Sequence, residues 1–189
     1  MRGSSRSARI GLKRGTVRLQ SHHPEWARSF AREQKRLLKA LGPLLADLQH
    51  VGSTAIPGVP AKPIIDIAVA ISSLKRADEA IKIIESLGYE YRADRGGPGR
   101  LFFTRGPESR RTHYLHLMEY DNEEWKSFLL FRDYLRTHKQ YAAEYADLKR
   151  KLAREFGERR GLYTGGKEEF VRRVVALALK EDKKQRRSR

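Results

Sequence analysis

The stretch His50-Val-Gly-Ser-Thr-Ala-Ile-Pro-Gly-Val-Pro-Ala-Lys-Pro-Ile-Ile-Asp-Ile-Ala-Val69 places a turn of small residues ahead of an apolar strand with one carboxylate. Gly52 and Ser53 form the turn, where backbone N–H groups can approach an anion closely. Alternation along the strand puts Asp66 on the face with mainly small side chains, which leaves room for a ligand. A carboxylate there can hold a divalent metal against the anion. The stretch therefore predicts half of a triphosphate-binding site.

The composition restricts the class of protein. A chain of 189 residues is long enough for one domain with a sizeable core, and 33% charged residues predict a strongly ionic surface. The absence of cysteine excludes disulfides and thiolate metal sites. No apolar run approaches the roughly 20 residues of a membrane span, and no signal-peptide pattern begins the chain. We therefore expect a cytoplasmic protein with no membrane partner.

Much of the formal net charge of +17 lies at the two ends of the chain. Residues 1–18 carry six basic side chains and no acid, and residues 180–189 carry six against two acids. We predict a basic flexible tail over 1–16, a single domain over 17–181 and a second basic tail over 182–189. Such tails attract polyanions without specificity, so they are either solvated ends or a non-specific contact to nucleic acid.

Hydrophobic periodicity predicts an α+β fold. Apolar alternation indicates strands, and near-helical spacing of apolar residues indicates helices. The expected strands are 48–52, 64–71, 89–93, 100–104 and 113–118, and the expected helices are 24–41, 74–87, two within 122–156, and 167–180. This order predicts a mixed β-sheet flanked by helices, followed by a C-terminal helical segment.

Several stretches together resemble one protein family. Besides the block from Val51 to Ile67, they are Pro24-Glu-Trp26, Leu87-Gly-Tyr89, Arg100-Leu-Phe-Phe103, Leu115-His-Leu117, Phe131–Arg136, Tyr145–Lys149 and Tyr163-Thr-Gly-Gly-Lys167. This ordered set, over about residues 17–178, resembles the GrpB family, a branch of the nucleotidyltransferase superfamily. The resemblance implies a nucleotidyltransferase-like fold.

The resemblance also implies a metal site, from which this sequence departs. The superfamily pattern is Asp-x-Asp after a Gly-Ser turn, and its second carboxylate position is Ala68 here. A third carboxylate usually comes from a later strand, where this chain offers His116. Imidazole is a poor ligand for magnesium but a good one for manganese or zinc. We therefore hypothesise a divalent metal, Mg or Mn, held by Asp66 and His116 with His50. The alternative is a structural network in which Asp66 bonds to His116 or pairs with Lys62 or Arg100.

Further side chains are candidates for binding phosphate. The resemblance implies that Ser53 and Thr54, with Gly52, contact phosphate, although the turn can also be purely structural. Lys62 lies in the same motif, and Lys167 sits at a helix start, where the helix dipole favours anions. Arg100 begins a strand and can either neutralise an anion or form a salt bridge. An exposed lysine without a ligand remains the alternative at both Lys62 and Lys167.

Three functions follow as expectations. The first is a metal-dependent nucleotidyltransferase that moves a nucleoside monophosphate from a nucleoside triphosphate to an unknown acceptor, with Asp66 and His116 as catalytic residues. The second is a non-catalytic nucleotide- or anion-binding protein of the same fold, which the alanine at position 68 favours. The third is a basic nucleic-acid-associated protein. Other templates are missing, because the chain has no Gly-x-Gly-x-x-Gly, P-loop or His-Glu-x-x-His motif.

Overall fold

A five-stranded sheet forms the centre of the protein in this computed structural model, which describes residues 10–187. Its strands are β1 (Leu45–Val51), β2 (Ile65–Ile71), β3 (Tyr89–Tyr91), β4 (Arg100–Arg105) and β5 (His113–Glu119). They lie in the order β1-β2-β5-β4-β3. The central pair β2 and β5 is parallel and the other pairs are antiparallel, so the predicted mixed sheet is confirmed.

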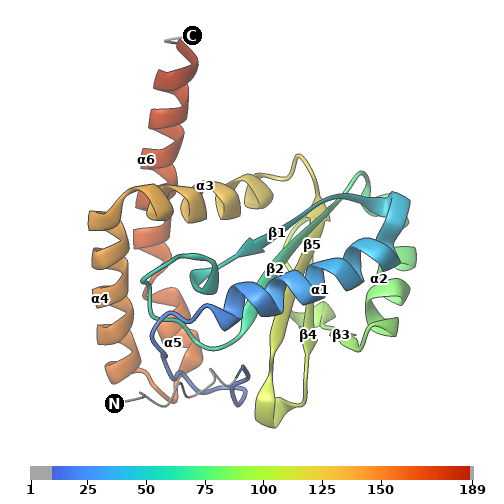
Figure 1. Ribbon diagram of the computed structural model, residues 1–189, viewed down its shortest axis with the longest axis horizontal. Helices are drawn as coiled ribbons and strands as arrows, with labels where there is room; N and C mark the ends of the chain where they lie inside the picture. The colour runs from blue at the N-terminus through green and yellow to red at the C-terminus, as the bar shows by residue number, and fades with distance from the viewer. Residues whose placement is uncertain (1–9, 188–189) are drawn as a thin grey trace, which may run out of the picture.

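Over residues 10–187, six α-helices accompany the sheet, and Figure 1 shows the last turns of α6 standing clear of it. They are α1 (Glu25–Leu41), α2 (Ala77–Ser86), α3 (Glu123–Thr137), α4 (Lys139–Glu155), α5 (Arg160–Gly165) and α6 (Glu168–Arg187). Single 3-10 turns occupy Gly42–Leu44, Ser53–Ala55, Leu74–Arg76, Ala93–Arg95 and Glu108–Arg110. The α+β class is therefore confirmed, whereas the short helix α5 is absent from the sequence-based prediction.

The two faces of the sheet carry different side chains. The branched residues of β2, such as Ile67 and Val69, pack with α1 and α2 in the main core. The opposite face carries Ala68 and Ala70, which pack against Trp125 of α3. The alternation predicted along β2 is confirmed, and it leaves Asp66 on the face with small neighbours.

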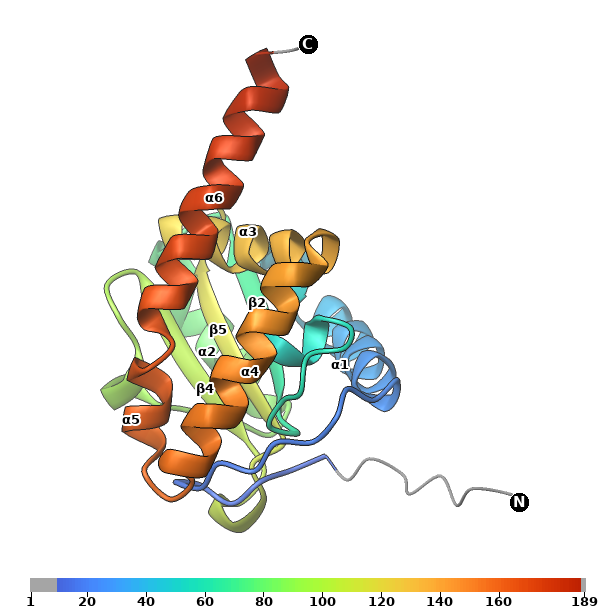
Figure 2. The same cartoon turned by 90° about the vertical axis from the view of Figure 1, so that its left-hand side faces the viewer.

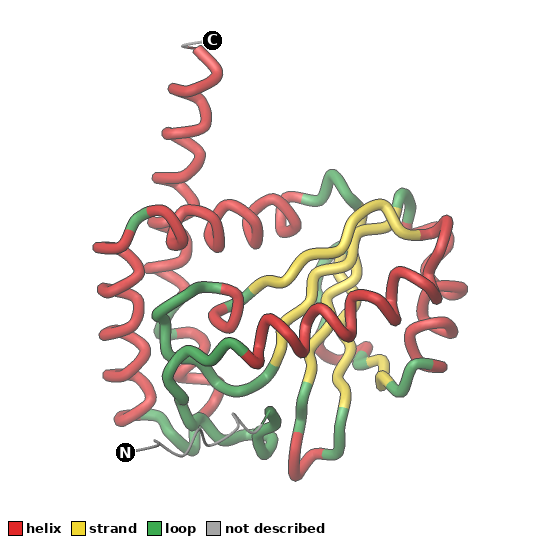
Figure 3. Tube along the Cα trace, in the orientation of Figure 1, coloured by secondary structure: helices red, strands yellow, loops and turns green. Residues whose placement is uncertain are grey.

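A second group of helices packs beside this small-residue face. In Figure 2, α4 and α6 stand in front of the sheet. Residues of α3, α4 and α6 form a separate core around Ile56 and Val59. These two residues belong to the long loop between β1 and β2, which is green in Figure 3. The loop thus joins the sheet to the helices, and the Gly52-Ser53 turn lies at its start.

The segment over residues 10–16 is attached to the sheet rather than free. The Gly11 N–H donates to Pro63 O at 2.7 Å, and the Arg14 N–H donates to Glu108 O at 2.7 Å. Leu12 forms a β-bridge with Arg111. The predicted flexible tail over 1–16 is therefore wrong for residues 10–16, because their backbone groups pair with the body of the protein. Residues 1–9 of that prediction lie outside the described residues.

Helix α6 runs beyond its predicted end at Lys180, as far as Arg187. Figures 1 and 2 show its last turns projecting past α3. Lysine, glutamate, glutamine and arginine are all good helix formers, so a polar segment can extend a helix that packing has already nucleated. Residues 182–187 of the predicted basic C-terminal tail thus continue α6, and residues 188 and 189 of that prediction lie outside the described residues. Among the residues that the structure describes, no helix is long and apolar enough to cross a membrane.

Candidate functional site

A pocket of about 280 Å³ lies between the small-residue face of the sheet and the helices α4 and α5. The loop after β1, the strands β2 and β5, the two helices and the residue before α6 all contribute to its walls. We call it the Asp66 pocket and define it by Ser53, Lys62, Asp66, Lys149, Arg160, Tyr163 and Lys167. Of the predicted site residues, Gly52, Thr54 and His116 also line it.

The glycine turn fits tightly against Asp66. Val51 pairs with Asp66 in the antiparallel ladder, so the chain turns away directly beside the carboxylate. Gly52 has φ +67°, a conformation that L side chains rarely adopt. A Cβ at this position would lie 2.6 Å from the Asp66 Oδ2 atom. The structure therefore brings Gly52, Ser53 and Asp66 together, and only glycine leaves room for this approach.

Four basic side chains surround the pocket. They are Lys62, Lys149, Arg160 and Lys167. Lys62 Nζ and Lys167 Nζ lie 5.5 Å and 4.6 Å from the ring centroid of Tyr163. Arg160 Nη1 donates to the Tyr114 hydroxyl at 3.0 Å. Within residues 10–187, none of the four forms an ion pair with a carboxylate, and Asp66 is the single acid lining the pocket. The pocket thus concentrates positive charge.

Lys149 is the most unusual of these cations. Its side chain is 1% exposed, and its ammonium group donates to the carbonyl oxygen of Pro60. Burial, with smaller contributions from Lys167 and Lys62, holds the Lys149 pKa well below its ordinary value. Burial, assisted by Arg160 and Lys167, also lowers the Lys62 pKa from 10.5 to about 7. These amines disfavour each other's charged form, and a bound anion would relieve that repulsion.

The contact with Arg100 indicates which ring nitrogen of a neutral His116 carries the proton. Arg100 Nη1 lies 2.9 Å from His116 Nδ1. A guanidinium group can only donate, so Nδ1 must accept, and a neutral imidazole then carries its proton on Nε2. Nε2 lies 4.0 Å from Asp66 Oδ1. The ring therefore points a proton, rather than a free lone pair, toward the carboxylate.

The residues around Asp66 do not fit a metal centre built by the protein. Ala68, at the second carboxylate position, has no oxygen ligand, and the proton on His116 Nε2 blocks coordination there. His50 lies on the other face of the sheet, where it stacks on Phe30 with ring centroids 4.6 Å apart. No group of three or more His, Asp or Glu side chains that could hold a metal occurs in the described part of the chain.

Two predicted phosphate-binding side chains are engaged elsewhere. Arg100 is not among the residues that line the pocket, and its Nε donates to Glu124 Oε2 at 2.8 Å. This geometry matches the salt-bridge alternative for Arg100. The Thr54 hydroxyl lies 2.9 Å from His50 Nε2, so it is already hydrogen-bonded although the residue lines the pocket.

Sequence reasoning missed Lys149 and Arg160. One signal for Lys149 was available, because it lies four residues after Tyr145 and therefore on the apolar side of a predicted helix. A lysine on such a stripe is rarely buried without a reason. Arg160 offered no comparable signal, since it begins a six-residue helix that the pattern did not predict.

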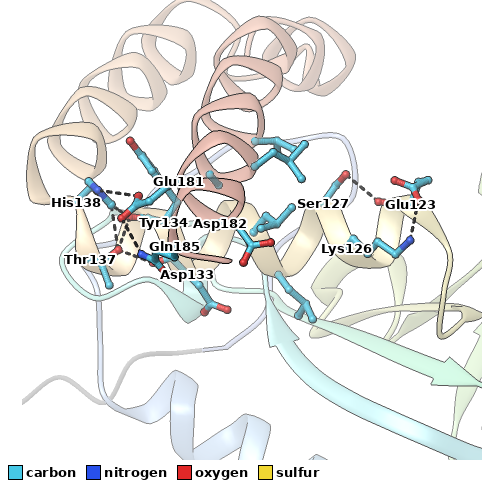
Figure 4. A pocket seen from close by; sticks show the side chains of 15 residues that line it. Glu123, Lys126, Ser127, Asp133, Tyr134, Thr137, His138, Glu181, Asp182 and Gln185 are labelled. Carbon is cyan, nitrogen blue, oxygen red and sulfur yellow. Dashed lines mark hydrogen bonds and ion pairs between the residues drawn. The ribbon is translucent and has the colours of Figure 1, made fainter. Parts of the chain in front are cut away.

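A wider groove, of about 760 Å³, lies between α3 and α6 (Figure 4). The two basic side chains that line it already have acidic partners. Lys126 Nζ lies 2.7 Å from Glu123 Oε1, and His138 Nε2 lies 3.3 Å from Glu181 Oε2. The groove therefore lacks the uncompensated charge of the Asp66 pocket, which we take as the candidate site.

The chain is similar to a family model, to several known sequences and to a solved structure. A family model described as "GrpB protein" matches residues 16–176. The UPF0157 protein YqkA of Bacillus subtilis is 36% identical over 156 residues, which span 82% of this chain but only 45% of YqkA. The glutamate-rich protein GrpB of Alkalihalophilus pseudofirmus is 34% identical, with 88% of this chain and 98% of that protein covered. The crystal structure of GrpB from Enterococcus faecalis superposes with a TM-score of 0.80 at 33% identity, covering 87% of this chain and 98% of that one.

Proposed function

The chain belongs to the GrpB family, and from the charges in its Asp66 pocket we propose that it binds the phosphate groups of a nucleotide there. Lys149 is the observation that carries the proposal. A buried ammonium group without a carboxylate partner is costly, and four cations against one acid leave a surplus of positive charge. A phosphate ligand supplies the missing negative charge.

Each wall of the pocket has a role in this proposal. Arg160 presents a planar guanidinium group, which suits two oxygens of one phosphate, whereas Lys62 and Lys167 act as point charges. The backbone and hydroxyl of Ser53 supply donors at the glycine turn. The ring of Tyr163 lies within 5.5 Å of both lysine ammonium groups, and cation–π attraction favours their staying near it.

The size of the pocket points to the phosphate moiety as the enclosed part of the ligand. Its volume of about 280 Å³ is slightly below that of most small-molecule sites, which usually measure about 300–1,000 Å³. A polyphosphate fits such a volume, while a complete nucleoside triphosphate would extend beyond it. We therefore expect the phosphates to dominate recognition and the base to contribute less.

Nucleotidyl transfer is a second candidate, favoured by the position of Asp66 beside the Gly52-Ser53 turn. In this reaction, an acceptor oxygen forms a bond to the α-phosphorus while the bond from that phosphorus to pyrophosphate breaks. Asp66, with 30% of its side chain exposed, could take the proton of the acceptor hydroxyl. Incubation with α-labelled nucleoside triphosphates and cell extract tests this candidate. Labelled product that Asp66→Asn abolishes would support transfer.

Calorimetric titration tests nucleotide binding directly. ATP, GTP, CTP, UTP and inorganic triphosphate are titrated into the protein and into Lys167→Met. Loss of one charge-assisted contact, about 1.5–3 kcal/mol, should weaken binding roughly tenfold to hundredfold. Lys126→Met is the matched control, because Lys126 pairs with Glu123 outside the pocket and should leave affinity unchanged. Equal affinity in both variants, or no binding to the parent protein, would contradict the proposal.

A further inference from the structure

We propose that the Asp66 pocket binds its polyphosphate ligand without a divalent metal ion, because Lys62, Lys149, Arg160 and Lys167 neutralise the phosphates directly. The inference rests on the proposed function and adds to it the chemical form of the ligand. It follows from two independent features of the pocket, the donor set around Asp66 and the balance of charge.

The donor set around Asp66 is too small for a hard cation. Magnesium and calcium are held by several oxygen ligands, and Asp66 is the single carboxylate in the pocket. Both oxygens of the Asp66 carboxylate also have close neighbours. The Gly52 backbone lies against Oδ2 so closely that a Cβ there would be 2.6 Å away, and His116 directs its Nε2 proton toward Oδ1. The position of the second carboxylate is Ala68, which is fully buried.

The basic side chains of the pocket supply the positive charge that a bound metal ion would otherwise supply to the phosphates. The ammonium groups of Lys62 and Lys167 both lie near the ring of Tyr163, at 5.5 Å and 4.6 Å from its centroid. Lys149 reaches the same pocket from the buried side of α4, and Arg160 reaches it from the start of α5. A divalent ion placed among them would be repelled by each of these groups that is protonated.

The balance of charge also favours a metal-free ligand. A bound phosphate favours the protonated form of each basic group, and with all four protonated and Asp66 ionised, the pocket carries a net charge of 4 − 1 = +3. A metal-free di- or triphosphate carries roughly three to four negative charges at neutral pH. Magnesium would cancel two of those charges and leave the buried Lys149 without its counter-charge. The pocket therefore complements the free polyphosphate better than its metal complex.

Titration of ATP and of inorganic triphosphate, in EDTA and in excess magnesium, tests the inference. We expect affinity in EDTA to equal or exceed affinity in magnesium. Binding that needs magnesium would overturn the inference while leaving the proposed function intact. No binding in either condition would overturn both, so the two failures are distinguishable.

The variant Asp66→Asn gives a second test, because metal-free binding and metal-bridged binding predict opposite changes in ligand affinity. If the cations of the pocket act alone, removing the negative charge of Asp66 should raise affinity in EDTA severalfold. If a metal bridges Asp66 and the phosphates, the variant should lose at least tenfold in affinity, and the inference fails. Folding is checked by melting temperature, and Lys149→Met should bind at least tenfold more weakly than the parent protein.

Manganese alone provides a measurement that does not depend on a nucleotide. Mn²⁺ is titrated into the parent protein and into Asp66→Asn, and binding is followed by water-proton relaxation. We expect the two proteins to bind Mn²⁺ equally, so that no Mn²⁺ site depends on Asp66. A stoichiometric site lost in that variant would overturn the inference.

Discussion

Gly52 links the backbone of the loop to the position of the Asp66 carboxylate. Its φ of +67° and the 2.6 Å separation between a hypothetical Cβ and Asp66 Oδ2 are two separate constraints. The first is met by any glycine in a left-handed turn. The second exists because β1 and β2 are adjacent at this point of the ladder.

The two constraints can be separated by a pair of alanine variants. Gly58 also has a positive φ, of +79°, but a Cβ there would meet nothing within 4 Å. Gly58→Ala should therefore cost about 1–3 kcal/mol of stability from backbone strain alone. Gly52→Ala should cost more and should also weaken nucleotide binding, because the new methyl group displaces Asp66. Urea denaturation and calorimetry measure both effects, and equal losses in the two variants would argue against the collision.

The lowered pKa of Lys62 predicts how stability depends on pH. Between about pH 7 and pH 10.5, the unfolded chain holds a proton on this amine that the folded protein has released. The free energy of unfolding should therefore rise with pH across that window, by at most about 1.4 kcal/mol per pH unit from this group. Below pH 7 the amine is protonated in both states and contributes no slope.

Chemical denaturation at several pH values checks this prediction. The difference in unfolding free energy between the parent protein and Lys62→Met should change between pH 7 and pH 10, in the direction that the parent gains stability. Lys126→Met is the control for loss of an exposed lysine. Parallel curves for the parent and Lys62→Met would mean that Lys62 keeps its ordinary pKa in the folded protein.

At the scale of single residues, the sequence predicted positions that depend on local periodicity. Alternation along one strand was enough to place Asp66 on the small-residue face. The proton on His116 Nε2 depends on Arg100, which comes from another strand, so no local pattern contains it. Lys149 lies in the pocket only because α4 packs beside the loop at Pro60.

At the scale of elements, α6 is longer than the helix predicted for it. Val174 is fully buried, whereas residues 183–185 are exposed and include no apolar side chain. The first part of α6 is therefore held by packing, and its last turns are held by helix propensity and by contacts such as Gln185 to Glu181. The helical spacing of apolar residues ends near Lys180. This pattern therefore could not predict the polar extension of α6.

Shortening α6 tests whether packing holds only its first part. A chain that ends at Asp182 should keep its melting temperature within about 2 °C, because it loses no buried apolar side chain. It should also bind duplex DNA more weakly at low salt if the basic residues beyond Asp182 contact nucleic acid. A chain that ends at Arg173 is the contrasting variant, and loss of Val174 should destabilise it severely. A large drop in melting temperature for the first variant would show that the extension supports the fold.

At the scale of the whole molecule, the order of predicted elements was sufficient for the mixed sheet and its helical layers. Such an order restricts topology because neighbouring elements usually pack together. It did not predict that α4 and α5 close the Asp66 pocket, since that contact joins segments far apart in the chain. The composition was less informative about the ends, where residues 10–16 pair with the body despite their basic character.

The order in which the walls of the pocket occur along the chain has a consequence for biosynthesis. All five strands are complete by Glu119, whereas the opposite wall begins at Tyr145 and ends at Lys167. At about 5–20 residues per second, a ribosome needs several seconds to pass from one wall to the other. During that interval the nascent sheet exposes Asp66 and its apolar neighbours without their cover. The pocket thus forms later than the sheet, and its ligand can recognise only chains whose translation has passed Lys167.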